Sequence, residues 1–93
     1  MIKYRNATNT TASVGVASVS VLAANESRKR AIIVNSGAAG VWLSFAAPAV
    51  VGQGVYLAPA GGSFEIDPDE LFTGAINRIA AGGANVCGVV EFY

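Results

Sequence analysis

Residues 31–46, AIIVNSGAAGVWLSFA, decide the fold of this chain. Two short apolar runs, 31–34 and 40–46, lie on either side of a turn signal, and we expect residues 36–40 to form a hairpin loop between two strands. The second run alternates with a period of two, which is typical of a strand with one buried face. One face of that strand would carry Val41, Leu43 and Phe45, and the other Trp42, Ser44 and Ala46.

Similar short segments continue in both directions along the chain. Within residues 13–21 the alternation slips by one position between Val16 and Val19, which indicates a β-bulge or a bend. Within residues 63–66, Phe64 and Ile66 are expected to face inward. The remaining strand candidates are residues 55–57, 75–80 and 86–93, and one helical turn is expected within 67–72.

These segments make about seven or eight short strands, at the spacing of about 8–12 residues that is typical of antiparallel sandwiches and barrels. No stretch of a dozen residues has a helical period. The sequence therefore predicts an all-β fold, a single antiparallel β-sandwich or jelly-roll-like barrel, over residues 13–93. Residues 1–12 are polar and are expected to form an N-terminal arm, either disordered or lying across a neighbouring subunit with Ile2 and Tyr4 as anchors.

The composition indicates a chain that binds other protein subunits. Hydrophobic residues make up 53% of the sequence and charged residues 13%, against about 25% charged residues in ordinary soluble domains. So much apolar surface exceeds what one small core hides, so we expect a homo-oligomer or a bound partner. The six basic and six acidic residues balance, which argues against nucleic acid and an anionic membrane surface as partners.

Membrane insertion and secretion are not expected. Residues 31–64 carry no charge, but glycine, proline and polar residues break this stretch into strand-like pieces too short to cross a bilayer. The early cations at the N-terminus are not followed by the apolar segment of a signal peptide.

The sequence favours a non-enzymatic protein without metal or cofactor. It has no histidine and one cysteine, so it cannot build a Cys/His metal site or an internal disulfide. Cys87 lies in an apolar strand and is expected to be a buried small side chain. The acidic run Glu65, Asp67, Asp69 and Glu70 is expected to be a solvated turn; a Ca²⁺ site or an acid–base pair are the alternatives.

Two groups of residues are candidates for partner contacts besides the arm. Arg28, Lys29 and Arg30 form a basic cluster in a loop, suited to solvent or to an acidic partner surface. Trp42 and Tyr56 are expected to pack within the domain or to form an aromatic platform for a sugar or a single-stranded nucleic acid.

Several segments in order resemble small β-sandwich proteins encoded among the virion genes of tailed bacteriophages. The resemblance covers about residues 18–93 and rests on turn-and-strand patterns. They are Leu22-Ala23-Ala24-Asn25 with Arg28-Lys29, then Ile33-Val34-Asn35, then Leu57-Ala58-Pro59 with Gly61-Gly62, and Phe72-Thr73-Gly74.

This resemblance implies a capsid decoration (cement) protein, or else a module of a head fibre or tail. Such cement proteins commonly sit as trimers on the capsid exterior and bind the major capsid protein, so the expected location is the virion, after synthesis in the host cytoplasm. The start methionine and a strand running to Tyr93 favour a separate decoration protein. The alternative function is a carbohydrate- or receptor-binding module.

Overall fold

Short runs of β-branched and aromatic residues, bounded by glycine, proline and asparagine, form eight strands in the part of the chain that the structure describes. The structure is a computed structural model that describes residues 4–14, 17–80, 82 and 85–93. The strands are β1 (Ala7–Val14), β2 (Val19–Leu22), β3 (Arg30–Asn35), β4 (Val41–Ser44), β5 (Val55–Leu57), β6 (Gly62–Ile66), β7 (Ile76–Ala80) and β8 (Asn85–Phe92). The expected helical turn is a 3₁₀ helix, η1 (Pro68–Glu70).

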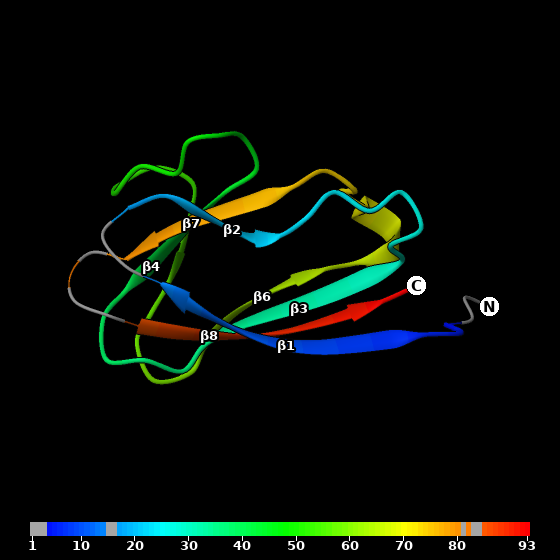
Figure 1. The fold of residues 1–93 in the computed structure, drawn as a ribbon, viewed down its shortest axis with the longest axis horizontal. Helices are drawn as coiled ribbons and strands as arrows, with labels where there is room; N and C mark the ends of the chain where they lie inside the picture. The colour runs from blue at the N-terminus through cyan, green and yellow to red at the C-terminus, as the bar shows by residue number, and fades with distance from the viewer. Residues whose placement is uncertain (1–3, 15–16, 81, 83–84) are drawn as a thin grey trace.

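The strands form two antiparallel sheets of four that face each other (Figure 1). Sheet 1 has the order β1-β8-β3-β6, and sheet 2 has the order β2-β7-β4-β5. The pairs are nested along the chain, because β1 pairs with β8, β2 with β7, β3 with β6 and β4 with β5. Nested pairs that alternate between two sheets are the jelly-roll arrangement. The prediction of an all-β sandwich with about seven or eight strands is therefore confirmed.

The core lies between the inner faces of the two sheets. In β4, Val41 and Leu43 are fully buried, while Trp42 and Ser44 on the opposite face are half-buried, as the alternation predicted. Ile66 is buried and Phe64 packs against the same core. The core residues are Val21, Leu22, Ala31, Ile33, Val41, Leu43, Leu57, Ile66, Ile76, Ala80, Cys87 and Val89.

The predicted hairpin at residues 36–40 is wrong, because β3 lies in sheet 1 and β4 in sheet 2. The chain crosses from one sheet to the other at Asn35, which is fully buried. Its side-chain Nδ2 donates to the carbonyls of Ala39 at 2.8 Å and Leu57 at 3.1 Å, and its backbone carbonyl oxygen accepts from the Gly61 amide at 2.7 Å. The buried Asn35 side chain therefore supplies hydrogen bonds to backbone carbonyls where the chain passes between the sheets, in place of the bonds that a hairpin would form.

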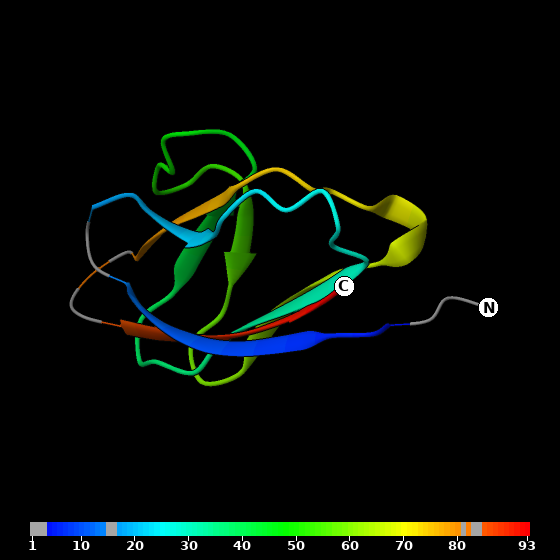
Figure 2. The same cartoon turned by 45° about the vertical axis from the view of Figure 1, so that its right-hand side comes forward.

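The predicted arm over residues 1–12 is wrong from Ala7 onward, because residues 7–12 belong to β1. β1 pairs with β8 along all eight of its residues at the edge of sheet 1 (Figure 2). Residues 7–11 are all exposed, so this strand has no hydrophobic alternation for a sequence pattern to reveal. Backbone pairing with β8 holds it in place instead.

The phase slip between Val16 and Val19 corresponds to a change of sheet. β1 ends at Val14 in sheet 1, and β2 begins at Val19 in sheet 2. Residues 15 and 16, on which part of this prediction rests, lie outside the described residues. A separate irregularity occurs further along, where the register of β2 with β7 shifts between Ser20 and Leu22.

Candidate functional site

Arg28, expected at a partner surface, is buried, with 1% of its surface exposed. Its Nε donates to Glu91 Oε2 at 2.6 Å, and its Nη2 donates to the Ala23 carbonyl at 2.7 Å. Its Nη1 donates to the carbonyls of Phe72 at 2.9 Å and Gly74 at 3.1 Å. The prediction that Arg28 contacts a partner is therefore wrong, because this guanidinium joins three segments of its own chain.

The other two cations of the basic cluster lie at the surface. Lys29 is exposed, and its backbone amide donates to the Phe92 carbonyl at 2.8 Å. Arg30 forms an ion pair with Glu65, and its Cζ lies 5.9 Å from the centre of the Phe92 ring. The ion pair is between partly exposed side chains, so its contribution to stability is small. The structure thus divides a three-residue cluster into one internal and two surface residues.

Tyr4 packs on its own domain. Its ring lies 5.0 Å from the ring of Phe92, and 37% of its surface is exposed. The backbone amide of the next residue, Arg5, donates to the Tyr93 carbonyl at 2.9 Å, which fixes this segment beside the C-terminus. Ile2, the other expected anchor of the arm, lies outside the described residues.

Trp42 and Tyr56 lie side by side on the outer face of sheet 2. They are directly opposite each other in the β4–β5 ladder, with ring centres 4.9 Å apart and an angle of 50° between the ring planes. Ile79 of β7 lies opposite Trp42 on its other side. Half of the Tyr56 surface is exposed. The structure therefore brings these two predicted residues together in one row, which we call the Trp42 row (Tyr56, Trp42 and Ile79).

The acidic run after β6 has local structural roles. Asp67 caps η1, since its side chain accepts a hydrogen bond from the Asp69 amide at 2.9 Å. Glu65 is on the outer face of β6, opposite Ile32 in the β3 ladder, and pairs with Arg30. Within the described residues no three His, Cys, Asp or Glu side chains gather closely enough to hold a metal ion. Asp67 and Asp69 are exposed, as expected for a solvated turn, whereas Glu65 belongs to β6. The side chain of Glu70 lies outside the described part of the structure.

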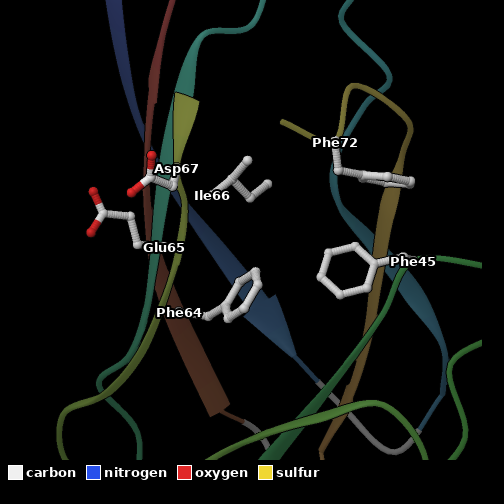
Figure 3. A pocket seen from close by; sticks show the side chains of 6 residues that line it. All are labelled: Phe45, Phe64, Glu65, Ile66, Asp67 and Phe72. Carbon is white, nitrogen blue, oxygen red and sulfur yellow. The ribbon is translucent and has the colours of Figure 1, made fainter. Parts of the chain in front are cut away.

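A hollow of about 390 Å³ opens between the sheets beside this turn (Figure 3). The Phe45 ring lines it, with its centre 5.5 Å from that of the Phe64 ring and 5.0 Å from that of the Phe72 ring. Ile66 also faces the hollow, whereas the carboxylates of Glu65 and Asp67 point away from it (Figure 3). Sequence reasoning missed this feature, although it placed Phe64 on an inner face and Phe45 on the same face of its strand as Val41 and Leu43.

Two polar groups are buried on the inner faces of β7 and β8. Arg78 is 2% exposed, and its Nη1 donates to the Ser20 carbonyl at 2.8 Å. Cys87 is fully buried, as expected, and this burial raises the pKa of its thiol. Burial of the Arg78 guanidinium lowers the pKa of that group. Both side chains lie inside the sandwich.

Three exposed valines gather where β2 begins. The Ala49 amide donates to Ser18 Oγ at 2.7 Å, so the β4–β5 loop lies against the start of β2. Val19 follows Ser18, and Val50 and Val51 follow Ala49, with 45%, 40% and 49% of their surfaces exposed. We call these residues the valine patch (Val19, Val50 and Val51). Sequence reasoning missed the patch, because it depends on a contact between segments thirty-one residues apart.

Comparison of this chain with protein-family models, curated proteins and solved structures found no match. No helix among the described residues has the length and apolar character needed to cross a membrane. The fold and the described side chains define a small jelly-roll β-sandwich. Its candidate functional features are the Trp42 row, the valine patch and the hollow between the sheets.

Proposed function

We propose that this chain is a structural virion protein, a capsid decoration (cement) protein that binds the capsid exterior and stabilises it through protein–protein contacts. The resemblance of residues 18–93 to small β-sandwich virion proteins supports this role, and the jelly-roll arrangement is compatible with it. A cement protein stabilises by burying area between subunits, at roughly 25 cal/mol per Å² of apolar surface before the cost of association.

The observation that carries the proposal is the valine patch. Three large, exposed apolar side chains lie in two segments that contact each other through the hydrogen bond from the Ala49 amide to Ser18 Oγ. The loop that carries Val50 and Val51 is uncharged, since residues 31–64 carry no charge, and Arg78, the charged cross-strand neighbour of Val19, is buried. Apolar side chains that gather at the surface away from charges mark a protein-binding site.

Binding to undecorated capsids tests this role directly. The purified chain is mixed with capsids of the phage whose genome carries this sequence, and the mixture is sedimented. We expect the chain to pellet with the capsids and to raise their melting temperature. The variant carrying Val50→Glu and Val51→Glu should lose at least tenfold in affinity, while Val86→Glu, at a valine exposed to a similar extent on β8, should bind normally. Failure of the wild-type chain to pellet would overturn the proposal.

The Trp42 row supports a second candidate, a carbohydrate- or receptor-binding module. Adjacent Trp and Tyr rings present an apolar surface with polar tips, which suits stacking against a sugar ring. This function predicts binding on a glycan array that Trp42→Ala abolishes and Tyr4→Ala leaves intact. An array without signal for the wild-type chain would remove this alternative.

A further inference from the structure

The outer edge of β1 presents a regular row of backbone groups. Asn6 and Tyr93 exchange two backbone hydrogen bonds, at 2.8 and 2.9 Å. Residues of an antiparallel pair alternate between bonded and non-bonded partners, so Ala7, opposite Phe92, does not bond to β8. The Phe92 carbonyl confirms this alternation, because it accepts from Lys29 on the side of β3. The residues of β1 whose N–H and C=O groups point away from β8 are therefore Ala7, Asn9, Thr11 and Ser13.

Over the described residues of β1, this edge lacks the lysine, proline, bulge or short length that often prevents strand addition. Sheet edges are normally protected by lysine, proline, a bulge or a very short strand. Residues 6–18 contain no charged residue and no proline, and β1 keeps one register with β8 over its eight residues. Residues 7–11 are exposed on both faces. A second strand can therefore pair along the whole edge without meeting a charge.

We propose that a second copy of this chain occupies this edge, through antiparallel pairing of β1 with β1 about a twofold axis. The axis passes between the two Thr10 residues, which face each other as a non-bonded pair. Asn9 of each copy pairs with Thr11 of the other, and Ala7 pairs with Ser13. Each of the four outward residues in each strand donates one backbone hydrogen bond and accepts one, so the ladder between the two strands contains eight hydrogen bonds. Sheet 1 then continues into the partner as one sheet of eight strands.

The symmetry of the strand favours a second copy over an unrelated partner. In this register every outward-pointing residue meets another outward-pointing residue of the same strand, so the edge is complementary to itself. No charge within residues 6–18 selects an acidic or a basic peptide. An isologous contact of this kind closes at two subunits. The pairing does not depend on the capsid role, and it differs from the trimer that the resemblance implies.

A disulfide tests the register. Cα atoms of a non-bonded antiparallel pair lie about 4.5 Å apart, within the range for a disulfide. We expect Thr10→Cys to oxidise almost fully to a covalent dimer under mild oxidation. Thr8→Cys is the matched control on the same face; its two copies would lie about 14 Å apart, at about 3.4 Å per residue, and should not link. The native Cys87 is buried and should not contribute. Equal linking of the two variants, or none, overturns the pairing.

Sedimentation equilibrium of the full chain tests the assembly itself. We expect a dimer at about 50 μM for the wild type. Thr11→Pro removes an outward N–H and leaves the bonds to β8 in place, so it should weaken the dimer at least a hundredfold and remain folded. A wild-type monomer or trimer overturns the inference. A trimer that binds capsids would overturn the β1 pairing and leave the proposed function in place. A dimer that binds no capsid would overturn the proposed function and leave the β1 pairing in place.

Discussion

Arg28 Nε donates to Glu91 Oε2 at 2.6 Å, and this contact ties the loop between β2 and β3 to the last strand of the chain. The remaining donors of the guanidinium bind the loop's own Ala23 carbonyl and the segment before β7. The Asn25 amide donates to the Thr73 carbonyl at 2.8 Å, which adds a backbone bond between the same two segments. The Arg28 side chain thus links the loop between β2 and β3 to β8 and to the segment before β7.

Removing this guanidinium should be strongly destabilising. Arg28→Met keeps most of the side-chain length but leaves the largely buried Glu91 carboxylate without its partner. Breaking a buried pair in this way costs about 3–5 kcal/mol. Arg30→Met is the control, since the more exposed pair between Arg30 and Glu65 should contribute less than about 1 kcal/mol. Urea unfolding of both variants measures the difference, and equal losses would contradict this role for Arg28.

The buried amide at Asn35 should matter more than its exposed neighbour. Asn35→Ala removes the donor to the carbonyls of Ala39 and Leu57, and leaving buried groups unsatisfied costs about 1–3 kcal/mol. Ser36→Ala removes an exposed hydroxyl that donates to the Val86 carbonyl at 3.2 Å, so its effect should be within about 0.5 kcal/mol. Thermal unfolding compares the two. A larger fall in the melting temperature for Ser36→Ala than for Asn35→Ala would contradict the stabilising role of the Asn35 side-chain hydrogen bonds.

Two glycines of the β4–β5 loop should respond differently to alanine. Both have positive φ, +90° at Gly52 and +96° at Gly54, so each substitution carries backbone strain of about 1–2 kcal/mol. A Cβ at Gly52 meets no atom within 4 Å, whereas a Cβ at Gly54 would overlap the Leu43 carbonyl oxygen. We therefore expect Gly54→Ala to be the more destabilising variant, with amide chemical shifts that move around Leu43. Equal free energies of unfolding would show that the overlap has no effect.

The Cys87 thiol should make the fold less stable in alkali. Burial raises its pKa in the folded chain above the ordinary value of 9.0. Above pH 9 the unfolded chain releases the thiol proton while the folded chain keeps it, so the free energy of unfolding should fall as the pH rises beyond 9. Urea midpoints measured from pH 7 to 10.5 test this. Cys87→Ala, which cannot titrate, should lack this part of the fall; an identical slope in both proteins would rule out the thiol as its cause.

Alternation identified the strands that have one buried face. Val41 and Leu43 were assigned to one face and are fully buried together, and the same reasoning placed Phe64 and Ile66 correctly. Breaks at glycine and proline separated these segments, so the all-β class and the approximate number of strands followed from local patterns. Local patterns carry this information because the faces of a strand depend only on its own residues.

Features that depend on distant segments were not predictable in this way. Residues 36–40 resembled a hairpin loop, because nothing near them shows that β3 pairs with β8 and β6 instead. Arg28 resembled a solvated cation, because its partner Glu91 is sixty-three positions away. β1 was missed because its exposed residues have no alternation. The valine patch and the hollow likewise depend on contacts that only the folded chain makes.

The nested order of the strands has a consequence for synthesis on the ribosome. β1 precedes the other described strands and pairs with β8, which follows them, so its hydrogen-bonding partner does not exist until the strands between them have been synthesised. Contacts so distant along the chain also slow folding after release. A nascent chain therefore carries an uncharged, pairable strand while the following strands are synthesised, and chaperones that shield such strands would be expected to raise its yield.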